Sequence, residues 1–114
     1  MKSVKSMIIL ICLSILFGCS METIRQLPIY QSSDDVKGLV NDTHWKKAEE
    51  EGKHIEKLYK ENKWKYQLMG DETEYNKLDE EISKLQVSLE EKDTKVAKRN
   101  IAVIQHFIES IYFR

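Results

Sequence analysis

Residues 95–112 read KVAKRNIAVIQHFIESIY, and they are the stretch that most clearly predicts the fold. Apolar side chains recur there in alternating steps of three and four, at Ala97, Ile101, Ile104, Ile108 and Ile111. This spacing puts all of them on one face of an α-helix. Val96, Val103 and Phe107 widen that face, and Asp93 is the expected cap. We therefore expect a helix over 95–112 at the core of an all-helical domain.

The preceding segment, residues 71–91, shows the same helical spacing. Its apolar stripe consists of Tyr75, Leu78, Ile82, Leu85 and Leu89. Asp71 and Glu74 form a D-x-x-E start, close to the capping box that satisfies the first amide groups of a helix. We expect a second long helix here, joined to the last one by a short turn.

The longest stripe lies in residues 43–69, with Asp42 or Thr43 as the expected cap. It consists of Trp45, Ala48, Gly52, Ile55, Tyr59, Asn62, Tyr66 and Met69. Glycine costs about 1 kcal/mol in a helix interior, and on this stripe Gly52 would let a neighbouring helix approach closely. Gly70 is expected to end the helix in a left-handed conformation.

Three apolar stripes joined by short turns predict antiparallel neighbours in a bundle. A shift of 49 residues lays five positions of the 43–69 stripe over five of the 95–112 stripe, Ala48, Gly52, Ile55, Tyr59 and Asn62 over Ala97, Ile101, Ile104, Ile108 and Ile111. The match is one of period rather than identity, and any pair of amphipathic helices could show it. The sequence therefore predicts the bundle without establishing an internal duplication.

Residues 34–40 are expected to add a short N-terminal helix. Val36, Leu39 and Val40 would face inward, with Ser33 as the cap. Residues 20–33 have no clean period and contain the only proline, Pro28. As a flexible coil, such a segment spans about 20 Å on average. We expect a helical domain over 34–114 behind a tether over 19–33.

Residues 1–18 have the features of a secretory signal peptide. Lys2 and Lys5 give it a positively charged start, and residues 7–17 form an apolar run. The run is too short for a spanning helix, which needs about 20 apolar residues. We therefore expect this segment to be cleaved and the rest of the chain to be exported.

The sequence Leu16-Phe17-Gly18-Cys19 resembles a lipobox, the bacterial signal for attaching lipid to a cysteine. Phe17 departs from the small residue usual at that position. Cys19 is the candidate lipidation site, and two or more acyl chains would hold the protein stably on a membrane. Ordinary cleavage that leaves Cys19 free, and an uncleaved anchor, stay open as alternatives. Because Cys12 is lost with the signal, the mature chain cannot form a disulfide within itself.

Composition argues against nucleic-acid binding and against catalysis. The formal net charge is -1, and it becomes more negative when the signal leaves with Lys2 and Lys5, whereas a nucleic-acid binder carries a net basic face. No pattern of a catalytic nucleophile is present. Residues 79–81 hold three carboxylates that should face water rather than a pocket. We expect no enzymatic activity and no cofactor.

Glu51 and His54 form an E-x-x-H pattern, which di-iron bundles use. Those sites need a second such pair, and none exists here, so a solvated ion pair is the expected interpretation. His44 and His106 add no close ligand spacing, so we expect no metal site. Residues 57–66 interleave lysines with aromatic side chains. Trp64 could rest at a lipid interface or pack on the N-terminal segment, and packing is the favoured interpretation.

These features together resemble the DUF4363 family of small bacterial lipoproteins of unknown function. The resemblance covers residues 40–112. It rests on Trp45-Lys46-Lys47-Ala48, a lysine-rich helix with Trp64, acidic turns and a closing apolar helix. Members often have a His in the middle acidic turn. Here that turn is residues 70–74, GDETE, without one, so a role tied to that His is not carried over. The resemblance implies a helical lipoprotein and supplies no activity.

Two hypotheses for function follow. The first is a non-enzymatic binding or accessory module, held by the lipid on Cys19 at the outer face of the cell membrane, where it contacts a membrane or envelope protein. The second is a structural envelope lipoprotein that self-associates as a homo-oligomer through its heptad-like stripes.

Overall fold

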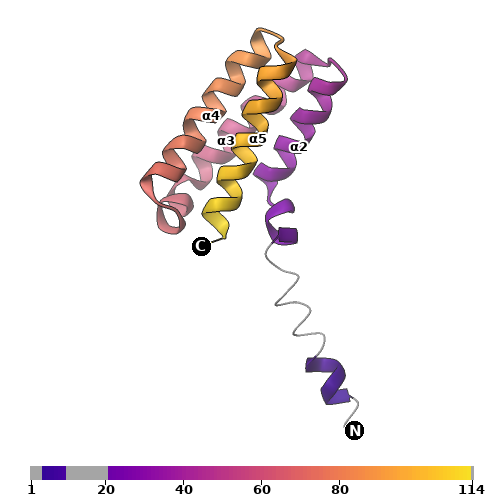
Figure 1. Ribbon diagram of the computed structural model, residues 1–114, viewed down its shortest axis with the longest axis vertical. Coiled ribbons are helices and arrows are strands. Elements are labelled where there is room, and N and C mark those ends of the chain that lie inside the picture. Colours follow the sequence, from indigo (N-terminus) through magenta and orange to yellow (C-terminus); the bar gives the residue numbers. More distant parts are fainter. Residues whose placement is uncertain (1–3, 10–20, 114) are drawn as a thin grey trace.

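The structure is a computed structural model, and it describes residues 4–9 and 21–113. Its main elements are the helices α2 (Pro28–Asn41), α3 (Trp45–Met69), α4 (Glu72–Glu90) and α5 (Thr94–Tyr112). Residues 4–9 and 21–25 are also helical. No strand occurs within the described residues, 4–9 and 21–113. The expected all-α antiparallel bundle is confirmed (Figure 1).

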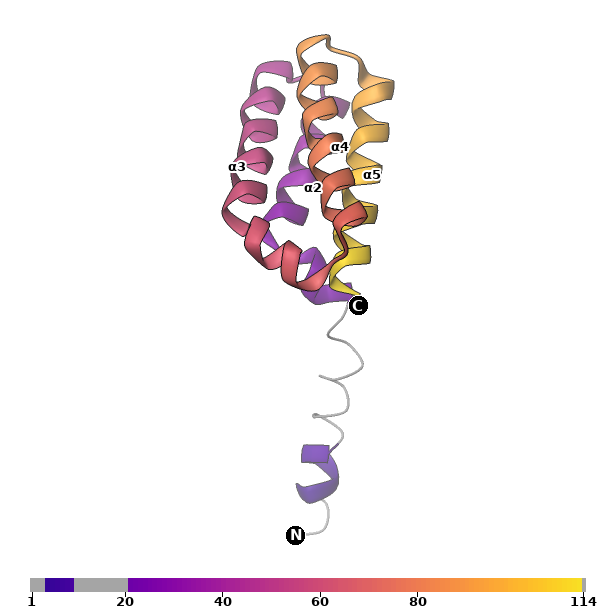
Figure 2. The same cartoon turned by 90° about the vertical axis from the view of Figure 1, so that its left-hand side faces the viewer.

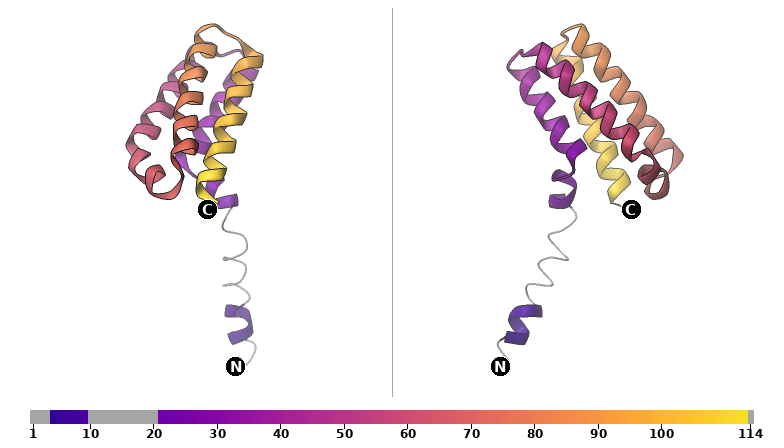
Figure 3. Two further views of the ribbon diagram at one scale, coloured as in Figure 1. Left: turned by 60° about the vertical axis from the view of Figure 1, so that its left-hand side comes forward. Right: turned by 180° about the vertical axis from the view of Figure 1, so that it is seen from behind.

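The four helices run alternately up and down and form a closed ring (Figures 1 and 2). Each helix packs along its sequence neighbour, α2 closes the ring against α5, and α3 barely touches α5 across the diagonal. As a result, residues 21–27, the α3–α4 turn and the C-terminal end of α5 lie at one end of the bundle (Figure 3). We call this the anchor end, because Cys19, the lipidation site expected from the sequence, shortly precedes residue 21. The opposite end, with the α2–α3 and α4–α5 turns, is the turn end.

The apolar stripes expected from the sequence form the core. In α5 all five stripe positions are at most 1% exposed, and α4 buries the same four aliphatic side chains that its spacing predicted. In α3 the stripe is also buried, with Trp45, Asn62 and Met69 only partly covered. Period alone therefore identified the inward face of three helices.

The N-terminal helix is longer than expected, and the boundary at residues 33 and 34 falls inside it. Proline at the first position of a helix costs no hydrogen bond and presets the backbone, and α2 begins with Pro28. The inward stripe of α2 is Ile29, Ser33, Val36 and Val40, in steps of four, three and four. The apolar pattern of α2 is interrupted at Ser33, because serine is a polar residue. It caps nothing; its hydroxyl donates to the Tyr30 carbonyl at 2.5 Å within the helix.

The expected helix ends are partly confirmed. Asp71 and Glu74 form the full capping box, and the Asp93 carboxylate accepts from the Val96 amide at 3.1 Å. The expected cap of α3 is wrong, because His44 occupies the N-cap position and its side chain caps nothing. The left-handed Gly70 is also wrong: its φ of -105° is ordinary extended backbone. A Cβ at position 70 would lie 3.0 Å from Ile111, so the glycine here allows α5 to pack closely against the end of α3.

The 49-residue spacing also relates α2 to α4 and the α2–α3 turn to the α4–α5 turn. We call α2 with α3 the first hairpin and α4 with α5 the second. The buried positions 29, 33, 36 and 40 of α2 correspond to 78, 82, 85 and 89 of α4. The turns also match: the amide of His44 donates to the Leu39 carbonyl, as that of Asp93 does to Ser88, and both turns place one residue in the left-handed region, Thr43 and Lys92. The bundle is thus two copies of one helical hairpin pattern.

Candidate functional site

The sequence-based site, Cys19, lies outside the described residues. None of the helices in the described part of the chain combines the length and apolar character needed to cross a bilayer. The structure therefore bears on the surfaces of the bundle, where three candidates can be compared: a groove, a buried polar contact and the anchor end.

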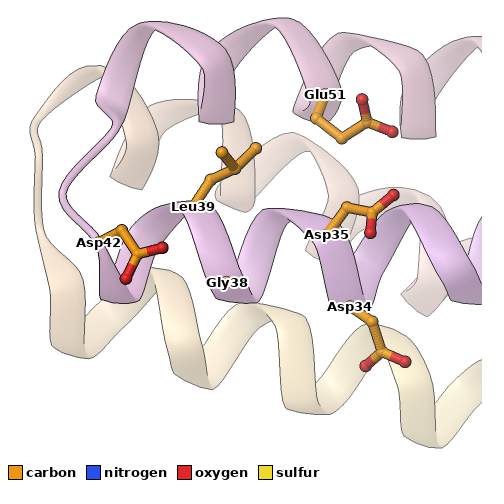
Figure 4. Close-up of a pocket in the computed structure, with 6 residues that line it drawn as sticks. All are labelled: Asp34, Asp35, Gly38, Leu39, Asp42 and Glu51. Carbon is orange, nitrogen blue, oxygen red and sulfur yellow. The ribbon is translucent and has the colours of Figure 1, made fainter.

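An acidic groove of about 440 Å³ runs between α2 and α3 near the turn end. Its lining residues are Asp34, Asp35, Gly38, Leu39, Asp42 and Glu51. Figure 4 shows Leu39 pointing toward α3, while Asp34 points to the other side of α2. Gly38 adds no side chain to this surface, and a Cβ at that position would meet nothing within 4 Å.

The residues that line the groove differ between the two hairpins. At the corresponding positions of the second hairpin, Val87 replaces Gly38, Ser83 replaces Asp34 and Lys84 replaces Asp35. Valine adds a side chain where the first hairpin has none, and lysine reverses the charge. The repeated framework therefore does not require this acidic surface, and the difference makes the groove a feature of its own.

Glu51 is held at the edge of this groove by two neighbours. The buried Ser32 hydroxyl donates to its Oε1 at 2.5 Å, and His54 Nδ1 lies 3.2 Å from the same oxygen. Burial alone would raise the pKa of Glu51, but the hydrogen bond from Ser32 and the contact with His54 outweigh it, so the pKa lies below its usual value. The expected pair of Glu51 with His54 is confirmed, and Ser32 is an additional member.

The trio of Ser32, Glu51 and His54 is not arranged as a catalytic triad. In a triad the imidazole bridges the serine and the carboxylate through its two different nitrogens. Here Ser32 lies 3.4 Å from Nδ1, the same nitrogen that faces Glu51, and Ser32 already donates to that carboxylate. The arrangement orients a carboxylate and joins α2 to α3.

The second hairpin has a polar contact at the corresponding place. Positions 32 and 51 correspond to 81 and 100. The Asn100 amide donates to Glu81 Oε2 at 3.2 Å and accepts from Ser88 at 2.9 Å. The Glu81 side chain is only 12% exposed, so the expectation that it faces water is wrong, whereas Asp79 and Glu80 are exposed as expected.

The other histidines bring no ligands together. His44 and His106 are exposed. No three histidine, cysteine, aspartate or glutamate side chains within residues 4–9 and 21–113 converge as a metal-binding group.

The anchor end contains a smaller cavity of about 250 Å³. The start of α2, the last turns of α3 and the end of α5 line it through Leu27, Pro28, Ile29, Asn62, Lys65, Tyr66 and Tyr112. Trp64 is close by in the sequence but is 60% exposed. The favoured interpretation that Trp64 packs on the N-terminal segment is therefore wrong.

Sequence reasoning missed the polar side chains that join α2 to its neighbours. Gln105 of α5 donates to Ser33 at 2.9 Å and to Asp34 at 2.8 Å, and the Tyr30 hydroxyl donates to Glu109 at 3.1 Å. The spacing of 29, 33, 36 and 40 was the available signal. It requires serine to be accepted as a core residue, which is reasonable when its hydroxyl can bond to a carbonyl of its own helix.

Comparison with known proteins identifies a family but no individual relative. A family model described as "Domain of unknown function (DUF4363)" matches residues 24–114. No curated protein and no solved structure matches. The matched range begins at Ile24, which is also the first buried residue of the described bundle.

Proposed function

This chain belongs to the DUF4363 family, and from that premise we propose that it is a bacterial lipoprotein, held by acyl chains on Cys19, whose bundle is a non-enzymatic binding or accessory module at the outer face of the cell membrane. The observation that carries the proposal is the order of segments: a charged start, an apolar run, Leu16-Phe17-Gly18-Cys19, and a folded domain from residue 24.

The bundle supports a binding role more than catalysis. Its concave acidic groove is open, and the polar trio beside it lacks the geometry of a nucleophile and base. The groove presents carboxylates without a buried reaction chamber. Such a surface can meet a partner protein, and it offers little to hold a reacting substrate.

Self-association through the stripes has less support. The side chains that suggested it, from Ile55 in α3 to Ile104 in α5, are buried within a single chain. A dimer would need other surfaces. The binding module is therefore the function we put forward, with the partner expected among membrane or envelope proteins.

Lipid attachment is tested by mass spectrometry of the mature N-terminus and by fractionation of a Cys19→Ala variant. We expect acyl chains on Cys19 in the parent protein and loss of membrane retention in the variant. A variant that is processed and retained like the parent would refute the anchor.

The binding role is tested by photo-crosslinking in intact cells. Gly38 in the groove and Val87 at the corresponding place of the second hairpin are both exposed, so a crosslinking residue at either position should be tolerated. We expect a recurring adduct with a membrane or envelope protein. Absence of adducts from both positions and from the anchor end would contradict the proposal.

A further inference from the structure

Two large apolar side chains of α3 are left in water near its C-terminal end. Trp64 is 60% exposed and Leu68 is 78% exposed. Four residues apart on a helix, they are neighbours on one face. Phe113, just after α5, is 52% exposed. Isolated exposed apolar residues are normal, but a group gathered at one place marks a contact surface.

All three belong to the anchor end. The ring of Tyr66, two residues from Trp64, meets the ring of Tyr112 with centroids 6.2 Å apart. Lys65 shares its cavity with Leu27 and Pro28 at the start of α2. Figures 1 and 3 show that the end of α3, the end of α5 and residues 21–27 lie at the same end of the bundle.

We propose that the anchor end lies in the interface of the lipid bilayer, with Trp64 and Leu68 entering it. This inference rests on the proposed lipid at Cys19. Five peptide links join Cys19 to the buried Ile24, and at 3.8 Å for each link the two α-carbons are at most about 19 Å apart. A lipid on Cys19 therefore holds this end of the bundle close to the membrane.

The chemistry of the surface fits a bilayer interface. Tryptophan prefers this zone because its ring is apolar and its N–H remains hydrated. Lysines beside it can extend their ammonium groups toward water and head groups. Lys63 and Lys65 flank Trp64, and neither takes part in an ion pair within the described ranges.

Apolar insertion rather than charge supplies the attraction. The start of α4, with Asp71, Glu72 and Glu74, brings acidic groups to the same end and offsets the lysines. We therefore expect contact with zwitterionic as well as anionic bilayers.

The test uses the lipidated protein with Trp64 as its single tryptophan. The chain has two tryptophans, Trp45 and Trp64, so the Trp45→Phe variant isolates the relevant one. It is reconstituted into phosphatidylcholine vesicles whose acyl chains carry bromine, which quenches tryptophan at short range. We expect the emission of Trp64 to fall at least two-fold and to shift to the blue relative to vesicles without bromine.

The Trp64→Phe variant is the matched control. It leaves Trp45 at the first position of α3. At 1.5 Å per residue, Trp45 lies about 28 Å along the helix from position 64, toward the turn end. Its emission should stay unquenched. The parent protein, with both tryptophans, should show intermediate quenching, which provides a reading that does not depend on how well Trp45→Phe folds.

Flotation of the vesicles separates the two proposals. Protein that floats with the vesicles while Trp64 stays unquenched overturns the interfacial contact and leaves the anchor intact. Protein that does not float refutes the anchor, and the interfacial contact falls with it. Equal quenching of Trp45 and Trp64 also overturns the inference, because the bundle would then lie flat.

Discussion

The first and second hairpins share one pattern of buried positions and fill it differently. Where the second hairpin has Ile82 and Ile101, the first has Ser33 and Gly52. The hydroxyl of Ser33 donates a hydrogen bond within its own helix and accepts one from the Gln105 side chain. The Gly52 carbonyl accepts a hydrogen bond from the Gln86 side chain at 2.6 Å. The first hairpin therefore replaces aliphatic volume with close approach and hydrogen bonds.

This contrast shows that a helical framework can persist where the inward face is no longer apolar in sequence. A small hydroxyl or a glycine on the inward face keeps the period while removing its apolar signal. On its outer surface the first hairpin also has a residue without a side chain, Gly38, which lines the acidic groove. In the second hairpin, the corresponding positions hold Val87 and Lys84.

The largest expected effect is at the pair of positions 33 and 82. Ile82 is 1% exposed, and Ile82→Ala should lower the free energy of unfolding by about 3 kcal/mol through lost burial and a residual cavity. Ser33→Ala should cost about 1 kcal/mol or less, the usual net value of one hydrogen bond. Denaturant unfolding measures both. Equal losses would refute the claim that the two hairpins rely on different interactions.

The second largest effect is expected at alkaline pH, where Tyr59 of the first hairpin should lower the free energy of unfolding. Burial, helped by the nearby Asp79 charge, raises the pKa of Tyr59 to about 12. The folded state thus favours the neutral phenol, so its contribution is fully present below pH 10 and is lost as the pH rises from 10 toward 12. Tyr59 alone would contribute a loss of about 1.4 kcal/mol per pH unit in that window. Tyr66 of the same helix, whose pKa is also raised by burial, adds to the total.

The corresponding position in the second hairpin is Ile108, which does not titrate. Tyr59→Phe should show a shallower fall of the melting temperature between pH 10 and 12, although it also loses the hydrogen bond to the Tyr75 carbonyl. Parallel pH profiles for the parent and the variant would show that Tyr59 is not the group responsible.

The same contrast explains what could be read from the sequence. Three helices were predicted because their stripes are aliphatic or aromatic, and the Asp71 and Asp93 caps because their side chains act locally. The boundary at 34 was wrong because Ser33 interrupts the apolar signal of α2. The groove could not be foreseen, because it depends on which helices become neighbours and on the space left at Gly38.

Two glycines sharpen the comparison at smaller scale. A Cβ on Gly52 would lie 2.8 Å from Leu89 Cδ1 and 3.1 Å from Gln86 Oε1. Gly52→Ala should therefore destabilise the protein by about 1 to 2 kcal/mol through overpacking, despite a better helix propensity. Gly38→Ala meets no atom and should stabilise it by about 0.5 to 1 kcal/mol. Thermal melting of both variants tests this. A stabilising effect of Gly52→Ala would mean that α4 does not pack so closely against α3 at this position.

The smallest expected effect concerns the caps of α3 and α5, the second helix of each hairpin. Asp93 caps α5, whereas His44 at the corresponding position of α3 caps nothing. Since the two turns share their backbone hydrogen bonds, an aspartate at position 44 should reach the amide of Lys47 as Asp93 reaches that of Val96. His44→Asp should stabilise the protein by about 0.5 to 1 kcal/mol, and Asp93→Ala should destabilise it by about 1 kcal/mol. Denaturant midpoints measure both, and a neutral or harmful His44→Asp would show that the backbone match between the turns does not extend to their capping geometry.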